Sequence, residues 1–129
     1  MIEKAEMKRI VIVDDEEPLL RVMKRALEQA FQAEITTFSD PFSAMNYVMS
    51  NAIDLAIVDY NMPSINGVDF LAALKSARPD MVRIIMSGED NSSFLKAAIN
   101  EAEVFRFIKI PWDTQELYSI VYKALRSRK

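Results

Sequence analysis

Short apolar runs alternate with longer amphipathic segments along the whole chain. The runs are rich in β-branched and aromatic residues and cover residues 10–13, 35–38, 55–58, 82–86 and 104–108, of which 35–38 is the weakest. Nearly continuous apolar runs of this length are typical of strands that are buried on both faces of a parallel sheet. We therefore predict five buried strands.

The segments after these runs repeat apolar residues every three or four positions, which is the period of one helix face. The repeating positions are Leu19, Leu20, Met23, Ala26, Leu27 and Ala30; Met45, Val48 and Met49; Val68, Leu71 and Leu74; Leu95, Ala98 and Ile99; and Leu117, Ile120, Val121, Ala124 and Leu125. Pro18 and Pro41 suit first helical positions, and Asp40 suits an N-cap. Asp113 followed by Glu116 resembles a capping box with Asp in place of the usual Ser or Thr.

Five strand–helix units in this order predict an α/β domain with an open, doubly wound parallel sheet. Parallel strands need crossover connections, and right-handed helical crossovers place helices against both faces of the sheet. Such sheets bind ligands in the crevice at the carboxyl ends of their strands. The residues that directly follow each apolar run are therefore the first candidates for chemistry.

Composition narrows the classes of function. The chain has 129 residues, a net charge of −3 and no basic stripe, so we expect one domain that does not bind nucleic acid. It has no cysteine and no histidine, which excludes disulfides, thiol metal sites and histidine-based catalysis. The apolar runs are too short to span a bilayer, and the charged stretch 1–8 is unlike a signal peptide. We expect a cytoplasmic protein without membrane contact.

Polar residues follow four of the predicted strands. The first run is followed by Asp14-Asp15-Glu16-Glu17 and the third by Asp59. The fourth is followed by Ser87-Gly88 and the fifth by Lys109-Ile110-Pro111. Three carboxylates in one crevice repel one another unless a cation binds or one of them is protonated. Hard oxygen ligands favour Mg²⁺ or Ca²⁺. A carboxylate can also act as a nucleophile that forms an aspartyl phosphate, with the metal and a nearby hydroxyl such as that of Ser87 offsetting the phosphoryl charge.

Each of these residues also has a plainer interpretation. An acidic run before a helix is common because the helix N-terminus favours negative charge. Asp59 alone, or Ser87-Gly88 alone, is typical of a turn, and Lys109 alone would be a solvated charge at a strand end. The functional hypothesis depends on all of them falling at the same end of one sheet.

The ordered set of motifs resembles the receiver domains of bacterial response regulators. The matching segments are IVIVDDEEP at 10–18, VDYNMP at 58–63 followed by Gly67, IMSG at 85–88, and FIKIPWD at 107–113. The resemblance implies a flavodoxin-like (βα)5 fold with strand order 2-1-3-4-5. It implies a single receiver domain over 1–129 with its core at 8–126, either complete or cut from a longer response regulator.

The resemblance also implies how the site would take a phosphoryl group. Asp59 would be the phosphoacceptor, and the donor would be a sensor histidine kinase or a phosphotransfer protein. Asp15 would bind Mg²⁺ directly, Asp14 would bind it mainly through water, and Asn61 would offer its backbone carbonyl. The absence of histidine fits a receiver to which no kinase or phosphotransfer module is attached.

Other matched residues concern the response to phosphorylation. Ser87 would hydrogen-bond the phosphoryl group, Phe107 would be the switch aromatic, and Asn61 and Glu89 would tune the lifetime of the aspartyl phosphate. The domain would shift between two pre-existing conformations. The surface of the fourth helix, fifth strand and fifth helix would then pair with an effector domain, a partner or a second copy.

One position departs from the family pattern. The family places a lysine directly before the proline and three residues after the switch aromatic, and both markers point to Ile110, with Lys109 one place too early. A shift of one residue moves a side chain to the other face of the sheet. Either the strand end bulges so that Lys109 reaches the phosphate, or the contact is missing, which is the case we expect. We also expect a cis bond before Pro111, as in the family.

Two further classes of function follow from these features. Without its lysine the domain would be a degenerate receiver that acts as a phosphorylation-independent interaction module. An enzyme or cofactor binder on the same fold is disfavoured, because the chain has only two glycines and no G-x-G-x-x-G or P-loop motif. The Pro-Trp-Asp motif resembles receivers joined to output domains such as HD-type cyclic-dinucleotide phosphodiesterases, so we expect any enzymatic output to lie in an effector domain. The sequence leaves the cognate kinase, the pathway and the oligomeric state open.

Overall fold

The computed structural model describes residues 7–88 and 92–127, except for the side chains of 92–95. Strands and helices alternate in the order β1 (Lys8–Val13), α1 (Glu17–Ala30), β2 (Ala33–Phe38), α2 (Pro41–Ser50), β3 (Leu55–Asp59), α3 (Gly67–Ala77), β4 (Val82–Ser87), α4 (Ser92–Ala102), β5 (Arg106–Lys109) and α5 (Thr114–Ser127). The five strands are parallel and lie in the order β2-β1-β3-β4-β5. The predicted fold class and strand order are confirmed.

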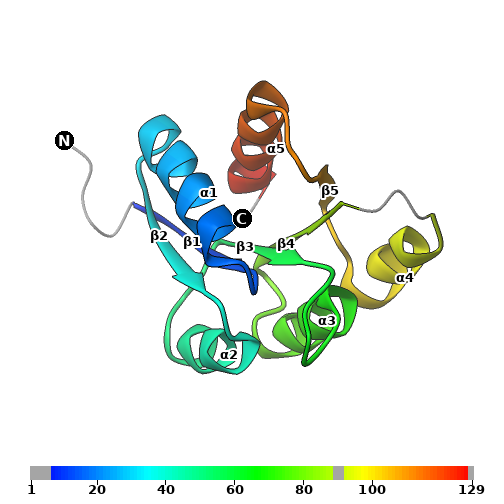
Figure 1. Ribbon diagram of the computed structural model, residues 1–129. Helices are drawn as coiled ribbons and strands as arrows, with labels where there is room; N and C mark the ends of the chain where they lie inside the picture. Colours follow the sequence, from blue (N-terminus) through cyan, green and yellow to red (C-terminus); the bar gives the residue numbers. More distant parts are fainter. Residues whose placement is uncertain (1–6, 89–91, 128–129) are drawn as a thin grey trace.

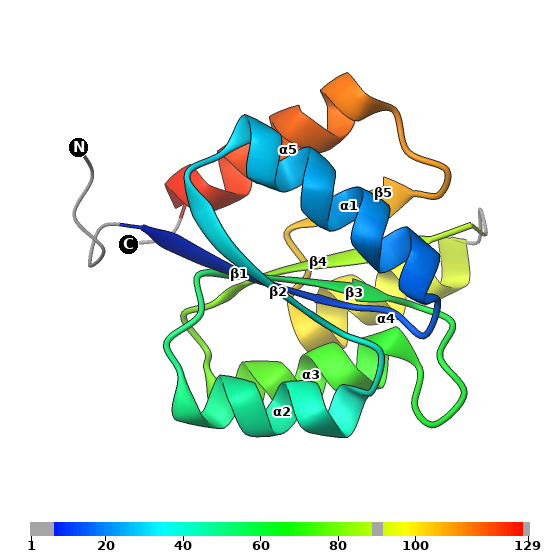
Figure 2. The same cartoon turned by 60° about the vertical axis from the view of Figure 1, so that its left-hand side comes forward.

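Helices cover both faces of the sheet, with α1 and α5 on one face and α2, α3 and α4 on the other (Figures 1 and 2). Alternate residues of each strand contribute to the two layers of the core. In β1, Ile10 and Ile12 pack in the cluster that includes α1 and α5, whereas Val11 and Val13 pack in the cluster of the opposite face. All five residues of the central strand β3 are buried. This burial on both faces explains the uninterrupted apolar runs in the sequence.

The predicted helix starts are found. The side chain of Asp40 accepts hydrogen bonds from the backbone N–H groups of Phe42 and Ser43, both at 3.2 Å. The side chain of Asp113 accepts one from the N–H of Glu116 at 2.9 Å. Each carboxylate satisfies N–H groups that have no partner within the first turn of its helix.

The predicted start of the fifth strand was wrong by two residues, since β5 begins at Arg106 rather than Val104. The backbone N–H of Val104 donates to the carbonyl of Ala98 at 3.3 Å, so this residue belongs to the turn that follows α4. Phe105 already donates to the carbonyl of Arg83 on β4, at 2.7 Å. Apolar character alone could not separate the helix end from the strand.

The start of α3 requires a glycine. The N–H of Gly67 donates to the carbonyl of Tyr60 at 2.8 Å, which closes the loop after β3. A Cβ atom on Gly67 would lie 2.8 Å from the Cα of Tyr60 and would also meet the backbone of Asp59. Only a residue without a side chain allows the helix to approach the end of β3 this closely.

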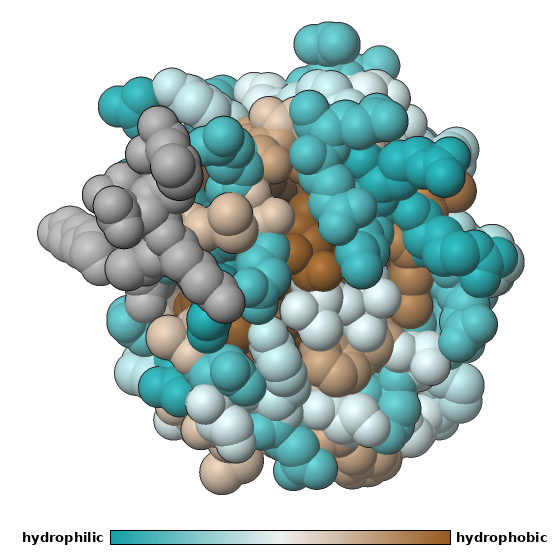
Figure 3. Space-filling view, turned by 90° about the vertical axis from the view of Figure 1, so that its left-hand side faces the viewer, coloured by the Kyte–Doolittle hydropathy of each residue, from teal (hydrophilic) through white to brown (hydrophobic). Residues whose placement is uncertain are grey.

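Some apolar side chains remain at the surface. Figure 3 shows a face on which hydrophilic residues border smaller apolar patches. Met49 and Ile99 belong to the predicted helix patterns, yet they are 64% and 60% exposed. Each follows a buried residue, Val48 or Ala98, and so points about 100° further around its helix. Among the described residues, no helix is long and apolar enough to cross a bilayer.

Candidate functional site

Three carboxylates from two neighbouring strands meet at one edge of the sheet. Asp14 and Asp15 follow β1, and Asp59 ends β3. Because Val13 pairs with Val58 across the two strands, the next residues, Asp14 and Asp59, follow this pair at the same edge of the sheet. One carboxylate oxygen from each of Asp14, Asp15 and Asp59 lies within 4.8 Å of the others. The predicted convergence of these carboxylates is confirmed.

Asp14 is the most enclosed of the three, with 1% of its surface exposed. Its Oδ1 accepts a hydrogen bond from the backbone N–H of Glu16 at 3.0 Å, whereas its buried Oδ2 has no hydrogen-bond partner. Glu16 occupies the N-cap position of α1, and its side chain makes no capping hydrogen bond. The interpretation of the acidic run as a helix cap therefore leaves the burial of Asp14 unexplained.

Burial and mutual repulsion hold two of these carboxyl groups far from their usual pKa. Burial raises the pKa of Asp14 to about 7, and the negative charges of Asp59 and Asp15 add to this, while the hydrogen bond from Glu16 opposes it. Burial, together with the charge of Asp15, raises the pKa of Asp59 to about 6. A cation among the three carboxylates would remove the repulsion and give Asp14 Oδ2 a partner. The hard oxygens of this donor set fit Mg²⁺ or Ca²⁺.

The carboxylates border a cleft of about 350 Å³ at the carboxyl ends of the strands. The residues that line it are Asp14, Asp15, Glu16, Leu19, Asp59, Asn61, Gly88 and Ile110. The cleft therefore lies at the carboxyl ends of β1, β3 and β4 and beside the segment after β5. This is where the fold class predicts a ligand-binding crevice. Glu16 and Leu19 were not among the predicted site residues, because the sequence pattern marks them only as the start of a helix.

Ile110, and not Lys109, lines the cleft. Lys109 pairs with Ser87 in the regular β4–β5 register, and the N–H of Ile110 continues the pairing with a 2.9 Å hydrogen bond to the carbonyl of Ser87. Lys109 is exposed and borders a separate cavity of about 140 Å³ with Trp112 and Glu116. The Ile110-Pro111 peptide bond is cis.

The two residues matched to the switch lie on β4 and β5, the strands that lead to the cleft residues Gly88 and Ile110. Ser87 is the last residue of β4 and is completely buried. Phe107 pairs with Ile85 and is half-buried in the core layer between the sheet and the helices α2, α3 and α4, whereas Ile110 packs with the opposite cluster. Phe107 and Ile110 thus face opposite sides of the sheet, as strand alternation predicts. Glu89 lies outside the described residues.

Sequence reasoning also missed an apolar groove beside the cleft. The groove has a volume of about 430 Å³ and is lined by Pro18, Leu19, Val22, Ile110, Pro111 and Trp112. The helix pattern had assigned Leu19 to the core, but it is only half-buried, and Val22 is 59% exposed. A signal was present in the Ile-Pro-Trp sequence, which places three apolar residues directly after a strand end.

A comparison with protein families matches residues 10–122 to the response regulator receiver domain. The DNA-binding transcriptional regulator NtrC of Azospirillum brasilense is 32% identical over 120 residues, which are 92% of this chain and 24% of that protein. The cyclic di-GMP phosphodiesterase response regulator RpfG of Xanthomonas campestris is 28% identical over 131 residues, which are 98% of this chain and 34% of that protein. The chain thus spans about a quarter of the length of the first relative and about a third of the length of the second.

A solved structure shows the same fold. The signal receiver domain of an HD domain-containing protein from Pseudomonas fluorescens superimposes with a TM-score of 0.90 at 28% sequence identity. The superposition covers 95% of this chain and 97% of that domain. The two folds therefore agree over nearly the whole of this chain.

Proposed function

The chain belongs to the response regulator receiver family, and we propose that it accepts a phosphoryl group on Asp59 in a Mg²⁺-dependent reaction and changes conformation in response. The observation that carries this proposal is the carboxylate cluster of Asp14, Asp15 and Asp59, in which a buried oxygen of Asp14 has no partner. A structural role alone would not stabilise three acidic groups at this distance, because their repulsion opposes folding.

Three residues would hold the metal. The exposed carboxylate of Asp15 would bind it directly, Asp14 mainly through water, and Asn61 through its backbone carbonyl. When bound, Mg²⁺ would neutralise the carboxylates and offset the negative charge on the phosphoryl oxygens. Asn61 lines the same cleft as both aspartates, which supports this arrangement.

Asp59 would be the nucleophile. A hydrogen bond from the backbone of Asn61 to its carboxylate opposes the rise in its pKa and so favours the ionised, nucleophilic form. An oxygen of Asp59 would form a bond to phosphorus as the phosphorus–nitrogen bond of a phosphohistidine breaks, and the electron pair of that bond stays on the imidazole. The donor would belong to a sensor histidine kinase or a phosphotransfer protein. The hydroxyl of Ser87 would donate a hydrogen bond to the phosphoryl group.

The response would pass from the cleft to the other end of β5. Phe107 would change its packing as the switch aromatic, and Asn61 and Glu89 would set how quickly water removes the phosphoryl group. The surface of α4, β5 and α5 would then pair with an effector domain, a partner or a second copy. Any enzymatic output would lie in an effector domain, and the domain would act in the cytoplasm.

Acetyl phosphate with Mg²⁺ tests the proposal. Mass spectrometry of the intact native protein should show one added phosphoryl group, and Asp59→Asn should abolish it. Asp54→Asn is the matched control, because Asp54 lies before β3 and accepts a 2.8 Å hydrogen bond from the backbone N–H of Arg9, away from the cleft. Equal labelling of wild type and Asp59→Asn would contradict the assignment.

The place of Ile110 in the cleft favours a second candidate, an interaction module that does not respond to phosphorylation. In this case the protein would keep its fold, and it would bind its partner equally well with and without phosphate. Beryllofluoride, which imitates a phosphoryl group on a carboxylate, separates the two candidates. A receiver should bind it with Mg²⁺ and shift the resonances of residues on α4 and β5, whereas the module should not.

A further inference from the structure

An apolar surface begins where the acidic cleft ends. We call it the apolar shelf, and it consists of the residues that line the 430 Å³ groove: Pro18, Leu19, Val22, Ile110, Pro111 and Trp112. Leu19 and Ile110 line the cleft as well, so the two hollows are continuous. Of the shelf residues, Leu19, Ile110 and Trp112 are half-buried against the core, which fixes their positions, while Val22 is largely exposed.

The cleft has a deficit of positive charge. Its described lining carries four carboxylates, those of Asp14, Asp15, Glu16 and Asp59, and neither lysine nor arginine. A divalent cation offsets only part of this charge, and a phosphoryl group on Asp59 would add more negative charge. Ile110 presents an apolar side chain at this place and cannot donate to a phosphoryl oxygen. A further cation would therefore have to come from outside the domain.

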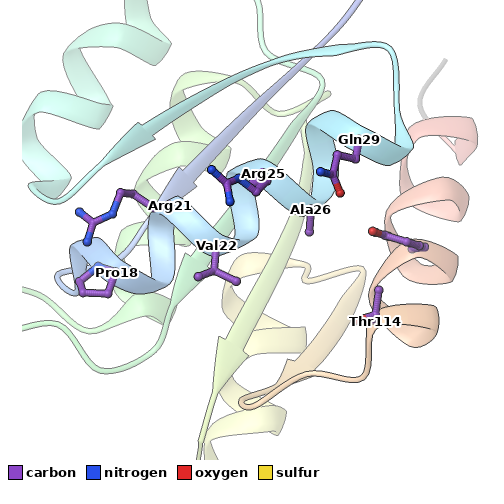
Figure 4. Close-up of a pocket in the computed structure, with 8 residues that line it drawn as sticks. Pro18, Arg21, Val22, Arg25, Ala26, Gln29 and Thr114 are labelled. Atoms are coloured by element: carbon purple, nitrogen blue, oxygen red, sulfur yellow. The ribbon is translucent and has the colours of Figure 1, made fainter.

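The far end of the shelf leads away from the carboxylates. It continues through Pro18 and Val22 into a groove of about 520 Å³ between α1 and α5. Figure 4 shows Val22 pointing to one side of α1 and the side chains of Arg21 and Arg25 projecting from the other side. A segment that lies on Val22 meets the carboxylates of the cleft at one end and no arginine of the shelf. The carboxylates therefore attract a basic side chain of the segment.

Building on the proposed phosphorylation of Asp59, we propose that the apolar shelf binds a segment of another protein in which apolar side chains adjoin a lysine or arginine. The apolar side chains lie on Val22 and Trp112, and the cation enters the cleft beside Ile110 and contacts the phosphoryl group. The partner supplies in trans the positive charge that this chain lacks at Ile110. Coupling between two binding sites is reciprocal. If the bound segment favours the phosphorylated state by a certain factor, phosphorylation raises the affinity for the segment by the same factor.

Beryllofluoride binding in the presence of short peptides tests this inference. The native protein with Mg²⁺ is titrated with beryllofluoride and followed by fluorine NMR, alone and with saturating acetyl-Lys-Leu-Leu-Ala amide. A charge-assisted contact should raise beryllofluoride affinity on the order of tenfold. Two controls use the peptide with norleucine in place of lysine, which keeps the apolar stem without the charge, and methylammonium chloride at the same concentration. Both should have little effect.

Variants of the protein locate the effect. Ile110→Lys places the cation within the chain, so beryllofluoride affinity should be high without peptide and insensitive to it. Val22→Gln removes an apolar contact from the shelf and should weaken the peptide several-fold. Met49→Gln is the matched control, because Met49 is similarly exposed but lies on α2, and it should leave peptide affinity unchanged.

The outcomes separate this inference from the proposed function. If neither wild type nor Ile110→Lys binds beryllofluoride under any condition, the proposed phosphorylation itself is wrong. If wild type binds it and the lysine peptide has no effect, or no more effect than the norleucine peptide or methylammonium, the shelf does not deliver a cation. If beryllofluoride alone produces a dimer in sedimentation and Val22→Gln abolishes it, the occupant is a second copy, and the assignment to another protein is overturned.

Discussion

The side chain of Arg83 holds the end of α4, because its Nε–H donates to the carbonyl of Ala102 at 2.6 Å. Arg83 lies on β4 and is 5% exposed, and its Nη1 donates to the carbonyl of Met81 at 2.7 Å. Its Nη2 lies 3.8 Å from an oxygen of Glu103, which follows α4 in a left-handed conformation with φ of 47°. Burial lowers the pKa of the guanidinium, and the charge of Glu103 opposes this shift. The guanidinium thus satisfies the carbonyl at the end of α4, where a helix leaves carbonyls without partners, and also the carbonyl of Met81 before β4.

Replacing Arg83 with methionine should therefore destabilise the domain. The apolar stem is kept, but the carbonyls of Ala102 and Met81 lose their donor. We expect a loss of about 2–4 kcal/mol in the free energy of unfolding, measured by urea denaturation. Arg106→Met on β5 is the control, because the guanidinium of Arg106 is exposed and lies over the ring of Phe105. A loss in Arg83→Met no larger than in this control would refute the assigned role.

The two glycines of the chain should respond differently to alanine. Gly67→Ala forces a methyl group against the backbone of Tyr60 and Asp59 and should cost about 1–3 kcal/mol. It should also slow phosphorylation by acetyl phosphate, because the end of β3 must shift. At Gly88 the added Cβ would lie 3.6 Å from the carbonyl oxygen of Ile110, an ordinary contact, so Gly88→Ala should change stability little. Equal thermal midpoints for the two variants would contradict the packing described for α3.

The metal-free domain should lose stability as the pH rises from about 4 to about 7 through its buried carboxyl groups. The folded state raises the pKa of Asp14 from 3.8 to about 7, so the folded protein binds this proton more tightly than the unfolded chain does. The contribution of this group to stability is therefore greatest below pH 4 and falls as the pH passes through the folded pKa. Asp59, raised to about 6, acts in the same direction.

Asp14→Asn isolates this contribution. In EDTA, its thermal midpoint should exceed that of wild type at pH 7.5, and the difference should shrink at pH 4. Mg²⁺ should raise the midpoint of wild type at pH 7.5 and have less effect on Asp14→Asn. Glu28→Gln, an exposed change on α1, serves as the control. A midpoint for Asp14→Asn that is lower than wild type at pH 7.5 in EDTA would show that repulsion does not govern the stability of the cluster.

Moving the lysine from position 109 to position 110 should place a cation in the cleft. The double variant Lys109→Thr with Ile110→Lys should raise the rate of phosphorylation by acetyl phosphate, because a charge-assisted hydrogen bond contributes on the order of 1.5–3 kcal/mol. Lys109→Ala should have little effect, since Lys109 is exposed and does not line the cleft. A large phosphorylation defect in Lys109→Ala would mean that this lysine reaches the phosphoryl group after all.

The sequence by itself determined the elements and the place of the site. Apolar runs such as 55–58 predict buried strands. Helices cover both faces of a parallel sheet, so every side chain of such a strand is buried and none needs to be polar. The carboxyl ends of parallel strands meet at one edge, so Asp14 and Asp59 could be placed together although they are far apart in the chain. The side-chain alternation of a strand also gave the opposite faces of Phe107 and Ile110.

Only the tertiary structure decided features that depend on contacts between elements. Arg83 interrupts an apolar run and gave no sign of burial, because its partners are the carbonyls of Ala102 at the end of α4 and of Met81 before β4. Val104 could not be separated from β5 until the end of α4 was known. The apolar shelf joins α1 to the segment after β5, two parts of the chain that no local pattern connects. Periodicity indicates which side of a helix or strand is apolar. The packing of the whole domain decides whether a neighbouring element covers that side or leaves it exposed.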